Sequence, residues 1–260
     1  VWADYDNDGD LDLFSCNETE PESEFLQGVF KYPSQLFENN GDGTFTEISR
    51  PSQFRGKGNA ALWWDPDEDG RPELYVANDF KDPDTFLVRQ SNGSFKDTIK
   101  SVVPHITWFS MGTDSADLDG DGRVDLFVAD MSGTNHFKQK VSMGAMSDNA
   151  EFLNTAVPRQ YMRNVVFLNT GTGRFREAAH MTGLANSDWT WTVRLSDFDN
   201  DGRVDAYFTN GMAVNLNVAD NEAALKALPG ETEWAKHQRA RTGPLKEQNL
   251  AFRNLGDLKF

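Results

Sequence analysis

The chain has 260 residues, of which 38% are hydrophobic, and its formal net charge is −16. This composition excludes a disordered chain, and the charge argues against direct binding to nucleic-acid phosphates. No apolar run approaches the ~18 residues that a membrane span needs. Cys16 is the single cysteine, so no disulfide can form within the chain.

Four acidic loops recur along the sequence. Each places acids at positions one, three, five and nine of a nine-residue run, with Gly at position six. The acids are Asp4, Asp6, Asp8 and Asp12 in loop one (4–12), Asp65, Asp67, Asp69 and Glu73 in loop two (65–73), Asp117, Asp119, Asp121 and Asp125 in loop three (117–125), and Asp197, Asp199, Asp201 and Asp205 in loop four (197–205). Loop two departs from the others in having Pro66 at position two and Glu73 at position nine.

These loops have the chemistry of calcium sites. Calcium takes six to eight oxygen ligands, and acids at alternate positions of a tight turn supply them. The backbone carbonyl at position seven adds another ligand, here from Asp10, Arg71, Arg123 or Arg203. An EF-hand closes with Glu at position twelve, where this chain has Ser15, Val76, Val128 and Phe208. We therefore expect the ninth-position acid to be the last protein ligand, and up to four bound Ca²⁺ ions that stabilise the fold.

A short apolar run follows each loop, and an aromatic hairpin follows each run. The runs are 13–17, 74–78, 126–130 and 206–210, and each ends in Asn or Asp. Runs that are apolar on both faces predict strands buried on both sides. The hairpins, at 36–45, 86–95, 167–175 and 252–260, turn at Asn and Gly residues, which tolerate the positive φ of tight turns. A repeated unit of about four strands predicts an all-β propeller with four visible blades.

The repeats divide one domain, 1–260, into units near 1–50, 51–100, 101–182 and 183–260. Three insertions, 18–32, 131–163 and 214–247, account for the uneven period, and residues 222–228 of the last favour a helix. Because Val1 stands directly before loop one, we expect a piece of a longer chain, an arc of a seven- or eight-bladed propeller. Insertions in repeat arrays usually build the variable, functional face.

The loops, the apolar runs and the hairpins resemble the FG-GAP repeats of integrin α-subunits and the bacterial VCBS repeats. The whole pattern is most similar to the ASPIC/UnbV branch, which is related to cartilage acidic protein. Met111-Gly112 before loop three and 161–164 before the third hairpin contribute to that similarity. The resemblance covers the chain outside the insertions, and it implies a calcium-stabilised propeller used in adhesion or protein contact.

Other candidate sites are weaker. His136, Tyr161 and Arg163, with Lys138, are the best acid–base candidates, although packing roles are more common for such residues. Trp63, Trp64, Trp189 and Trp191 stand just before loops, where packing between blades is the favoured interpretation over a ligand platform. The strand-end residues Asn17, Asn78, Asp130 and Asn210 could line the propeller mouth or cap their strands.

The sequence therefore predicts an exported binding module, located outside the cell, at its surface or in the periplasm. Its expected partner is a protein or a glycan at the propeller face, with no nucleic acid and no membrane span. Two alternatives stay open. One is a lyase, hydrolase or biosynthetic enzyme of UnbV type whose site is built by the insertions, and the other is a structural spacer in a surface assembly.

Overall fold

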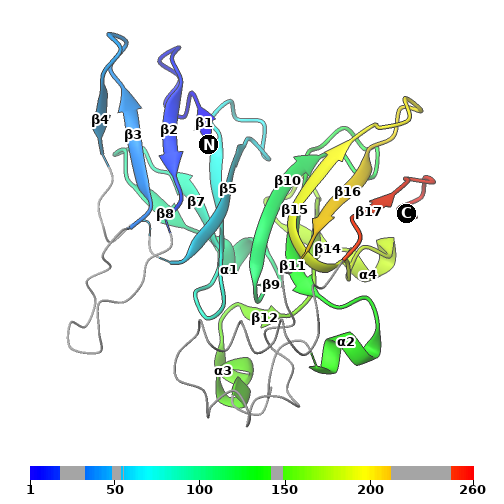
Figure 1. The fold of residues 1–260 in the computed structure, drawn as a ribbon. Coiled ribbons are helices and arrows are strands. Elements are labelled where there is room, and N and C mark those ends of the chain that lie inside the picture. Colours follow the sequence, from blue (N-terminus) through cyan, green and yellow to red (C-terminus); the bar gives the residue numbers. More distant parts are fainter. Residues whose placement is uncertain (18–32, 49–53, 55, 142–148, 212–246) are drawn as a thin grey trace.

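The computed structural model describes residues 1–17, 33–48, 54, 56–141, 149–211 and 247–260. The described chain is built almost entirely of antiparallel sheets with a few short helices (Figure 1). Its strands fall into four units, which we call sheets one to four, and each unit carries one acidic loop between its first two strands.

Sheets one and two are four-stranded meanders. Sheet one consists of β1 (Trp2–Ala3), β2 (Asp12–Ser15), β3 (Gln35–Asn39) and β4 (Phe45–Glu47). Sheet two consists of β5 (Gly58–Trp64), β6 (Glu73–Asn78), β7 (Thr85–Arg89) and β8 (Phe95–Asp97), and α1 (Ile99–Val102) follows it.

Sheets three and four are joined into one seven-stranded sheet because β11 also pairs with β15, at Met131 opposite Trp189 and Ser132 opposite Asp188. Sheet three consists of β10 (Ser110–Ala116), β11 (Asp125–Ser132), β13 (Val165–Asn169) and β14 (Phe175–Glu177), and α4 (Ala179–Thr182) follows it. Sheet four consists of β15 (Asp188–Ser196), β16 (Asp205–Asn210) and β17 (Leu250–Phe252).

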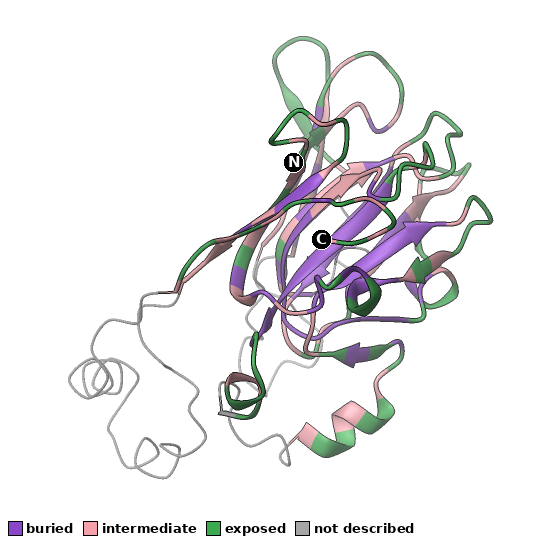
Figure 2. Cartoon of the chain, turned by 90° about the vertical axis from the view of Figure 1, so that its right-hand side faces the viewer, coloured by how far each residue is buried: buried purple, intermediate pink, exposed green. Residues whose placement is uncertain are grey.

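The strand after each loop is an interior strand, as predicted, since β2, β6, β11 and β16 each pair with a strand on both sides. Every residue of β6 and β11 is buried (Figure 2). The structure adds a strand before each loop, so the acidic loop is the turn of a hairpin. The hairpin predicted at 252–260 has only its first strand, β17, and no second strand forms after the turn at 256–258.

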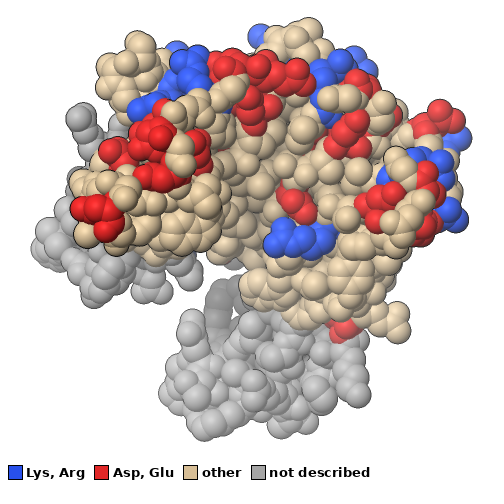
Figure 3. Space-filling view, turned by 90° about the horizontal axis from the view of Figure 1, so that it is seen from above, with Lys and Arg blue, Asp and Glu red and all other residues tan. Residues whose placement is uncertain are grey.

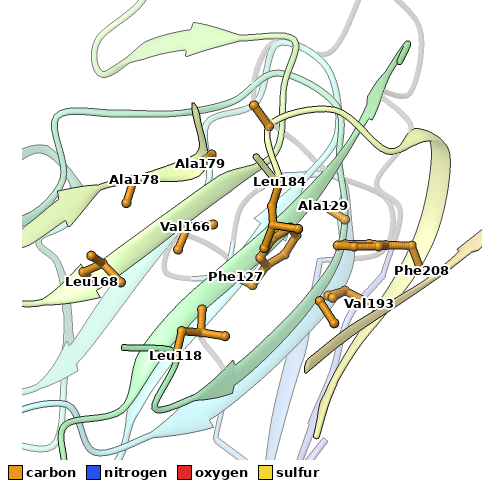
Figure 4. Packing of buried hydrophobic residues seen from close by; sticks show 12 residues of the cluster. Leu118, Phe127, Ala129, Val166, Leu168, Ala178, Ala179, Leu184, Val193 and Phe208 are labelled. Carbon is orange, nitrogen blue, oxygen red and sulfur yellow. The ribbon is translucent and has the colours of Figure 1, made fainter. Parts of the chain in front are cut away.

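Successive sheets pack face to face, and this packing explains why the interior strands are apolar on both faces. Alternate residues of β6 face opposite neighbours: Val76 packs with sheet one and Tyr75 with sheet three. Between sheets three and four, Phe127 meets Phe208 at a ring distance of 5.3 Å (Figure 4). Burying one such Phe side chain contributes roughly 1.5–3 kcal/mol. The chain is thus an all-β stack of sheets; closure into a ring and the blade number stay predictions.

The insertion at 131–163 extends below the sheets in the view of Figure 1. It begins within β11 and contains α2 (His136–Val141), α3 (Ala150–Thr155) and β12 (Arg159–Tyr161). Strand β12 pairs in parallel with β9 (His105–Thr107). The insertion 18–32 and the helix expected at 222–228 lie outside the described residues. None of the helices in the described ranges has the length and apolar character to span a bilayer.

Candidate metal sites

The first-position aspartate organises each acidic loop. Its carboxylate accepts the backbone N–H groups of positions five and six in all four copies. In loop two, for example, Gly70 N–H donates to Asp65 Oδ2 at 2.7 Å. The glycine at position six has φ between 83° and 97° in every loop, a region that other residues rarely adopt. The hydrogen bonds and the glycine therefore together form the sharp turn, which brings the acids to the same side of the loop.

The ninth-position aspartate ties three of the loops to the sheet. In loop three, Asp125 Oδ2 accepts Leu118 N–H at 2.9 Å and Asp125 Oδ1 accepts Asn169 N–H at 2.8 Å. The same pair of bonds fixes Asp12 and Asp205. The second donor is always the backbone N–H of an asparagine: Asn39 and Asn169 are the last residues of β3 and β13, and Asn254 lies two residues beyond β17. A residue predicted only as a ligand therefore also joins the loop to the aromatic hairpin.

Carboxylate oxygens converge in each loop. Three acids offer oxygens that all lie within 4.8 Å of one another. The groups are Asp4, Asp6 and Asp8; Asp65, Asp67 and Glu73; Asp117, Asp119 and Asp125; and Asp197, Asp199 and Asp205. Loop one gathers positions one, three and five, whereas the other loops gather positions one, three and nine. The clusters lie on the face seen from above in Figure 3.

The fifth-position acid has a different partner in loops two to four. Asp69, Asp121 and Asp201 each pair with the arginine at position seven of their own loop. In loops three and four this arginine also donates to a hairpin carbonyl, as Arg123 Nε does to Asn169 O at 2.9 Å. The predicted carbonyl ligands of Asp10, Arg71, Arg123 and Arg203 stay predictions.

The electrostatics of the clusters favour a cation. Burial and then the charge of Asp67 raise the pKa of Glu73 to about 8. Burial likewise raises the pKa of Asp125 to about 6, although its two backbone hydrogen bonds oppose the shift. Burial and neighbouring acids also raise the pKa values of Asp6, Asp67 and Asp119. Carboxylates held this close disfavour one another's charged form, and a dication would relieve that repulsion.

The residues present fit calcium. Every converging donor is an oxygen, which suits a hard cation and excludes the Cys and His ligand sets of zinc. Glu73 is only 6% exposed, and its Oε2 meets no hydrogen-bond donor among the described residues. An unpaired buried carboxylate oxygen is costly, and coordination to an ion would satisfy it.

The acid–base candidates do not come together as predicted. His136 is exposed on α2, and Lys138 forms an ion pair with Asp188 at 2.8 Å. Tyr161 and Arg163 instead meet His105 and Glu177, which sequence reasoning missed. Arg163 Nη2 lies 2.8 Å from His105 Nε2, which lies 3.3 Å from Glu177 Oε2.

Glu177 is held in its charged form. Burial alone would raise its pKa, but contacts with His105, Ala179 N–H and Arg163 outweigh burial and hold the pKa below its usual value. The pairing of β9 with β12 creates this cluster from distant parts of the chain, and no local motif marks it.

Three of the four residues predicted at strand ends bond the segment that follows them, whereas Asp130 lies within β11 and bonds the segment before that strand. Asn17 and Asn78 each donate a side-chain N–H to the carbonyl of a proline, Pro33 and Pro83, and Asn210 donates to Gln248 O. Asp130 has no side-chain N–H, and its Oδ2 accepts Trp108 N–H at 2.8 Å and Phe109 N–H at 3.2 Å. For Asn17, Asn78 and Asn210 these contacts favour the strand-capping interpretation over a polar ring at a propeller mouth.

Two of the tryptophans pack between sheets. Trp63 of sheet two stacks on Tyr5 of sheet one at 5.7 Å, and Trp64 meets Phe175 of sheet three at 6.2 Å. Trp191 differs: it is 51% exposed, and its Nε1 donates to Gly211 O.

The fold and the sites define a class of repeated β-sheet proteins in which each sheet carries an acidic loop that could hold a metal ion. Residues 65–128 and 150–208 match the model of the FG-GAP-like repeat, so these two segments are similar to that repeat. Each match runs from one unit into the interior strand of the next.

No curated protein matches the sequence. One similar solved structure is that of a lectin from Agrocybe aegerita, described as recognising non-reducing terminal N-acetylglucosamine. It is 14% identical, with a TM-score of 0.33, and the alignment covers 82% of this chain and 60% of the lectin chain. The chain thus spans 60% of the length of that lectin.

Proposed function

We propose that this chain is a calcium-stabilised arc of a β-propeller from the ASPIC/UnbV branch of the FG-GAP proteins, and that it acts outside the cytosol as a module that binds a protein or a glycan. The observation that carries the proposal is the repetition of one acidic cluster at the same place in four sheets. A single acidic turn is commonly exposed to water without a ligand. Acidic clusters repeated at the same place in four sheets instead indicate a shared role, which we propose is calcium binding.

Calcium acts on stability in this proposal. In loops two to four, the ion joins positions one and three of the turn to position nine, the first residue of the interior strand. Binding to the folded state alone adds about 2.7 kcal/mol per site when free calcium is 100 times the dissociation constant. Extracellular modules bind calcium at about 0.1–1 mM, which is why we place the protein outside the cytosol.

The test is thermal unfolding of the chain in calcium, in EGTA, and in EGTA followed by excess calcium. We expect calcium to raise the midpoint by roughly 2–4 °C per kcal/mol of added stability, and re-addition to restore it. An unchanged midpoint would contradict the structural role of calcium. Calorimetric titration gives the number of ions, for which we expect four.

The binding role has its own test. The calcium-loaded chain, probed on a glycan array and on immobilised extracellular proteins, should retain a partner that it loses in EGTA. If the chain retains the partner equally well in EGTA, ligand binding does not depend on the metal sites.

An enzyme is the second candidate, and the observation that favours it is the cluster of His105, Tyr161, Arg163 and Glu177. Tyr161 is 45% exposed and lies edge-on to His105 at 5.0 Å, so one side of the cluster faces solvent. Turnover of a hydrolase or lyase substrate panel that disappears in His105→Gln, with folding intact, would support this candidate. Absence of turnover across the panel favours the binding module.

A further inference from the structure

Loop two is built differently from the other three loops. In loops one, three and four, both oxygens of the ninth-position aspartate accept backbone N–H groups. Loop two has Glu73 at this position, and Glu73 Oε2 meets no donor in the described part of the chain. The side chain is nonetheless 6% exposed and belongs to the oxygen cluster with Asp65 and Asp67.

The sequence supplies a physical reason for this difference. The donor to the ninth-position oxygen is the N–H of position two, from Tyr5, Leu118 or Phe198. Loop two has Pro66 there, and proline has no N–H to donate. The two departures of loop two are therefore linked. Beside Pro66, an Asp at position nine would lose one of its two backbone hydrogen bonds. A Glu has an extra methylene and can reach the ion without that bond.

The second bond also differs in sheet two. In the other sheets it comes from the backbone N–H of Asn39, Asn169 or Asn254. In sheet two the equivalent position is Arg89, the last residue of β7, and no bond from its N–H to Glu73 occurs among the described residues. The Arg89 guanidinium turns toward sheet one and lies 5.1 Å from the centre of the Tyr5 ring. Arg71 is exposed and bonds Asp69, whereas Arg123 and Arg203 reach hairpin carbonyls.

There is space beside Glu73. A cavity of about 210 Å³ between sheets two and three is lined by Glu73, Asp67 and Pro66 on the loop side and by Asn169 and Phe175 on the other. A carboxylate next to this space can rotate, and water can enter to complete the coordination shell of an ion.

We propose that loop two is a calcium-selective site in which Glu73 gives both carboxylate oxygens to one ion. The proposal rests on the calcium binding proposed above. Calcium accepts bidentate carboxylates and irregular shells, whereas magnesium requires a near-octahedral shell with oxygens at 2.0–2.1 Å. The narrow bite of a bidentate carboxylate suits calcium only. In the other loops each oxygen of the ninth-position aspartate already accepts a backbone N–H, so we expect these carboxylates to adjust less to an ion and to discriminate less between calcium and magnesium.

The experiment reads each loop separately. The backbone N–H of the glycine at position six donates to the first-position aspartate in every loop. Spectra of glycine-labelled protein, titrated with calcium and with magnesium, therefore report four sites through Gly9, Gly70, Gly122 and Gly202. Loss of the Gly70 response in Asp65→Asn assigns that signal.

Glu73→Asp is the test variant, and Asp125→Glu in loop three is its matched control, because loop three keeps both backbone donors. We expect Glu73→Asp to lower the calcium-over-magnesium preference at Gly70 by about tenfold, which corresponds to ~1.4 kcal/mol. The responses of Gly9, Gly122 and Gly202 should not change, and they confirm folding. Asp125→Glu should leave the preference at Gly122 within about threefold, because its carboxylate stays fixed.

Glu73→Gln is the second variant, since it keeps the length of the side chain but has a single oxygen, and it should also lower the preference at Gly70. An unchanged preference at Gly70 in both variants would overturn the proposal while leaving calcium binding intact. Glycines that respond to neither ion would instead overturn the proposed function itself.

Discussion

The two ends of the interior strands both bury carboxylates, but they hold them in different ways. At the loop end, oxygens of Glu73 and Asp125 face other acids. At the far end, Asp84 is surrounded by donors: Tyr75 Oη at 2.5 Å, Asn78 N–H at 2.8 Å and Thr107 Oγ1 at 3.0 Å. We propose that a cation completes the cluster at the loop end, whereas at the far end the protein itself supplies the partners of Asp84.

Asp130 lies between these two cases. Its Oδ2 accepts two backbone N–H groups, but its Oδ1 is buried without a partner, and burial raises its pKa to about 7. Nearby Asp84, with all its donors, has a pKa of about 6, again raised by burial. The comparison shows that hydrogen bonds reduce the cost of a buried carboxylate but do not remove it.

The largest expected effect on stability comes from replacing one carboxylate by an amide at each end of the interior strands. Asp125→Asn should destabilise the calcium-loaded protein by ~3 kcal/mol, because it weakens the ion site and turns an amide N–H toward a buried backbone N–H. Asp130→Asn should stabilise by ~1 kcal/mol at pH 8, because the amide oxygen still accepts both N–H groups and no charge is buried. Urea unfolding of both variants checks the pair.

The calcium dependence of these variants is the control. The loss in Asp125→Asn should shrink when calcium is removed, whereas the gain in Asp130→Asn should be the same with and without it. Equal calcium dependence at both ends would remove the distinction between them.

The next effect is on pH. In metal-free protein, the pKa values of Glu73, Asp125, Asp84 and Asp130 all lie above their ordinary values. Each group therefore adds stability that is fully present below about pH 4 and is lost as the pH rises through 6–8. Calcium competes with protons at the loops, so its contribution should grow with pH.

We expect calcium to add more stability at pH 8 than at pH 5, by more than ~1 kcal/mol. Unfolding curves in calcium and after exhaustive dialysis, at both pH values, measure this difference. A calcium contribution that is independent of pH would mean that the loop carboxylates do not bind the ion.

A smaller effect is expected at Asn254, whose side-chain N–H donates to Leu118 O of loop three at 3.1 Å and to Val204 O at 3.0 Å. Asn254→Ala should cost ~1 kcal/mol, because it leaves two carbonyls without this donor. It should also weaken calcium binding at loop three, read at Gly122. An effect confined to loop four would show that the bond between the sheets does not matter.

The smallest effect is expected at Trp191, which lies beside the far end of β16 but contacts neither of the carboxylates compared above. Trp191→Phe removes an exposed hydrogen bond to Gly211 O and should change stability by less than ~0.5 kcal/mol. Chemical denaturation checks this value. A larger loss would indicate that this tryptophan packs against part of the protein outside the described residues.

Much of the fold could be predicted from local patterns. The acid spacing and the apolar run behind it correctly placed the four interior strands, because a strand buried on both faces leaves a continuous apolar signal. The strand before each loop was harder to recognise. In β5, exposed Asn59 and buried Trp64 occur in one strand, so its pattern is neither alternating nor uniform.

The parts of the site that sequence reasoning missed depend on long-range contacts. The second bond of Asp125 comes from Asn169, and the recurrence of this asparagine in three of the four hairpins was the available signal. His105 and Glu177 gave no such signal, since only the parallel pairing of β9 and β12 brings Arg163 to them. Loop two shows the reverse. Pro66 and Glu73 were visible in the sequence as departures from the pattern, but the hydrogen bonds of the other loops were needed to recognise that the two substitutions are linked.

The asparagine amides that cross between sheets have a mechanical consequence. Asn169 donates to Pro66 O of loop two at 2.7 Å, as Asn254 does to loop three. Tension applied along the chain would therefore reach loops two and three through a bond from the following sheet. If these loops bind calcium as proposed, the force needed to separate neighbouring sheets would depend on the calcium concentration around the protein.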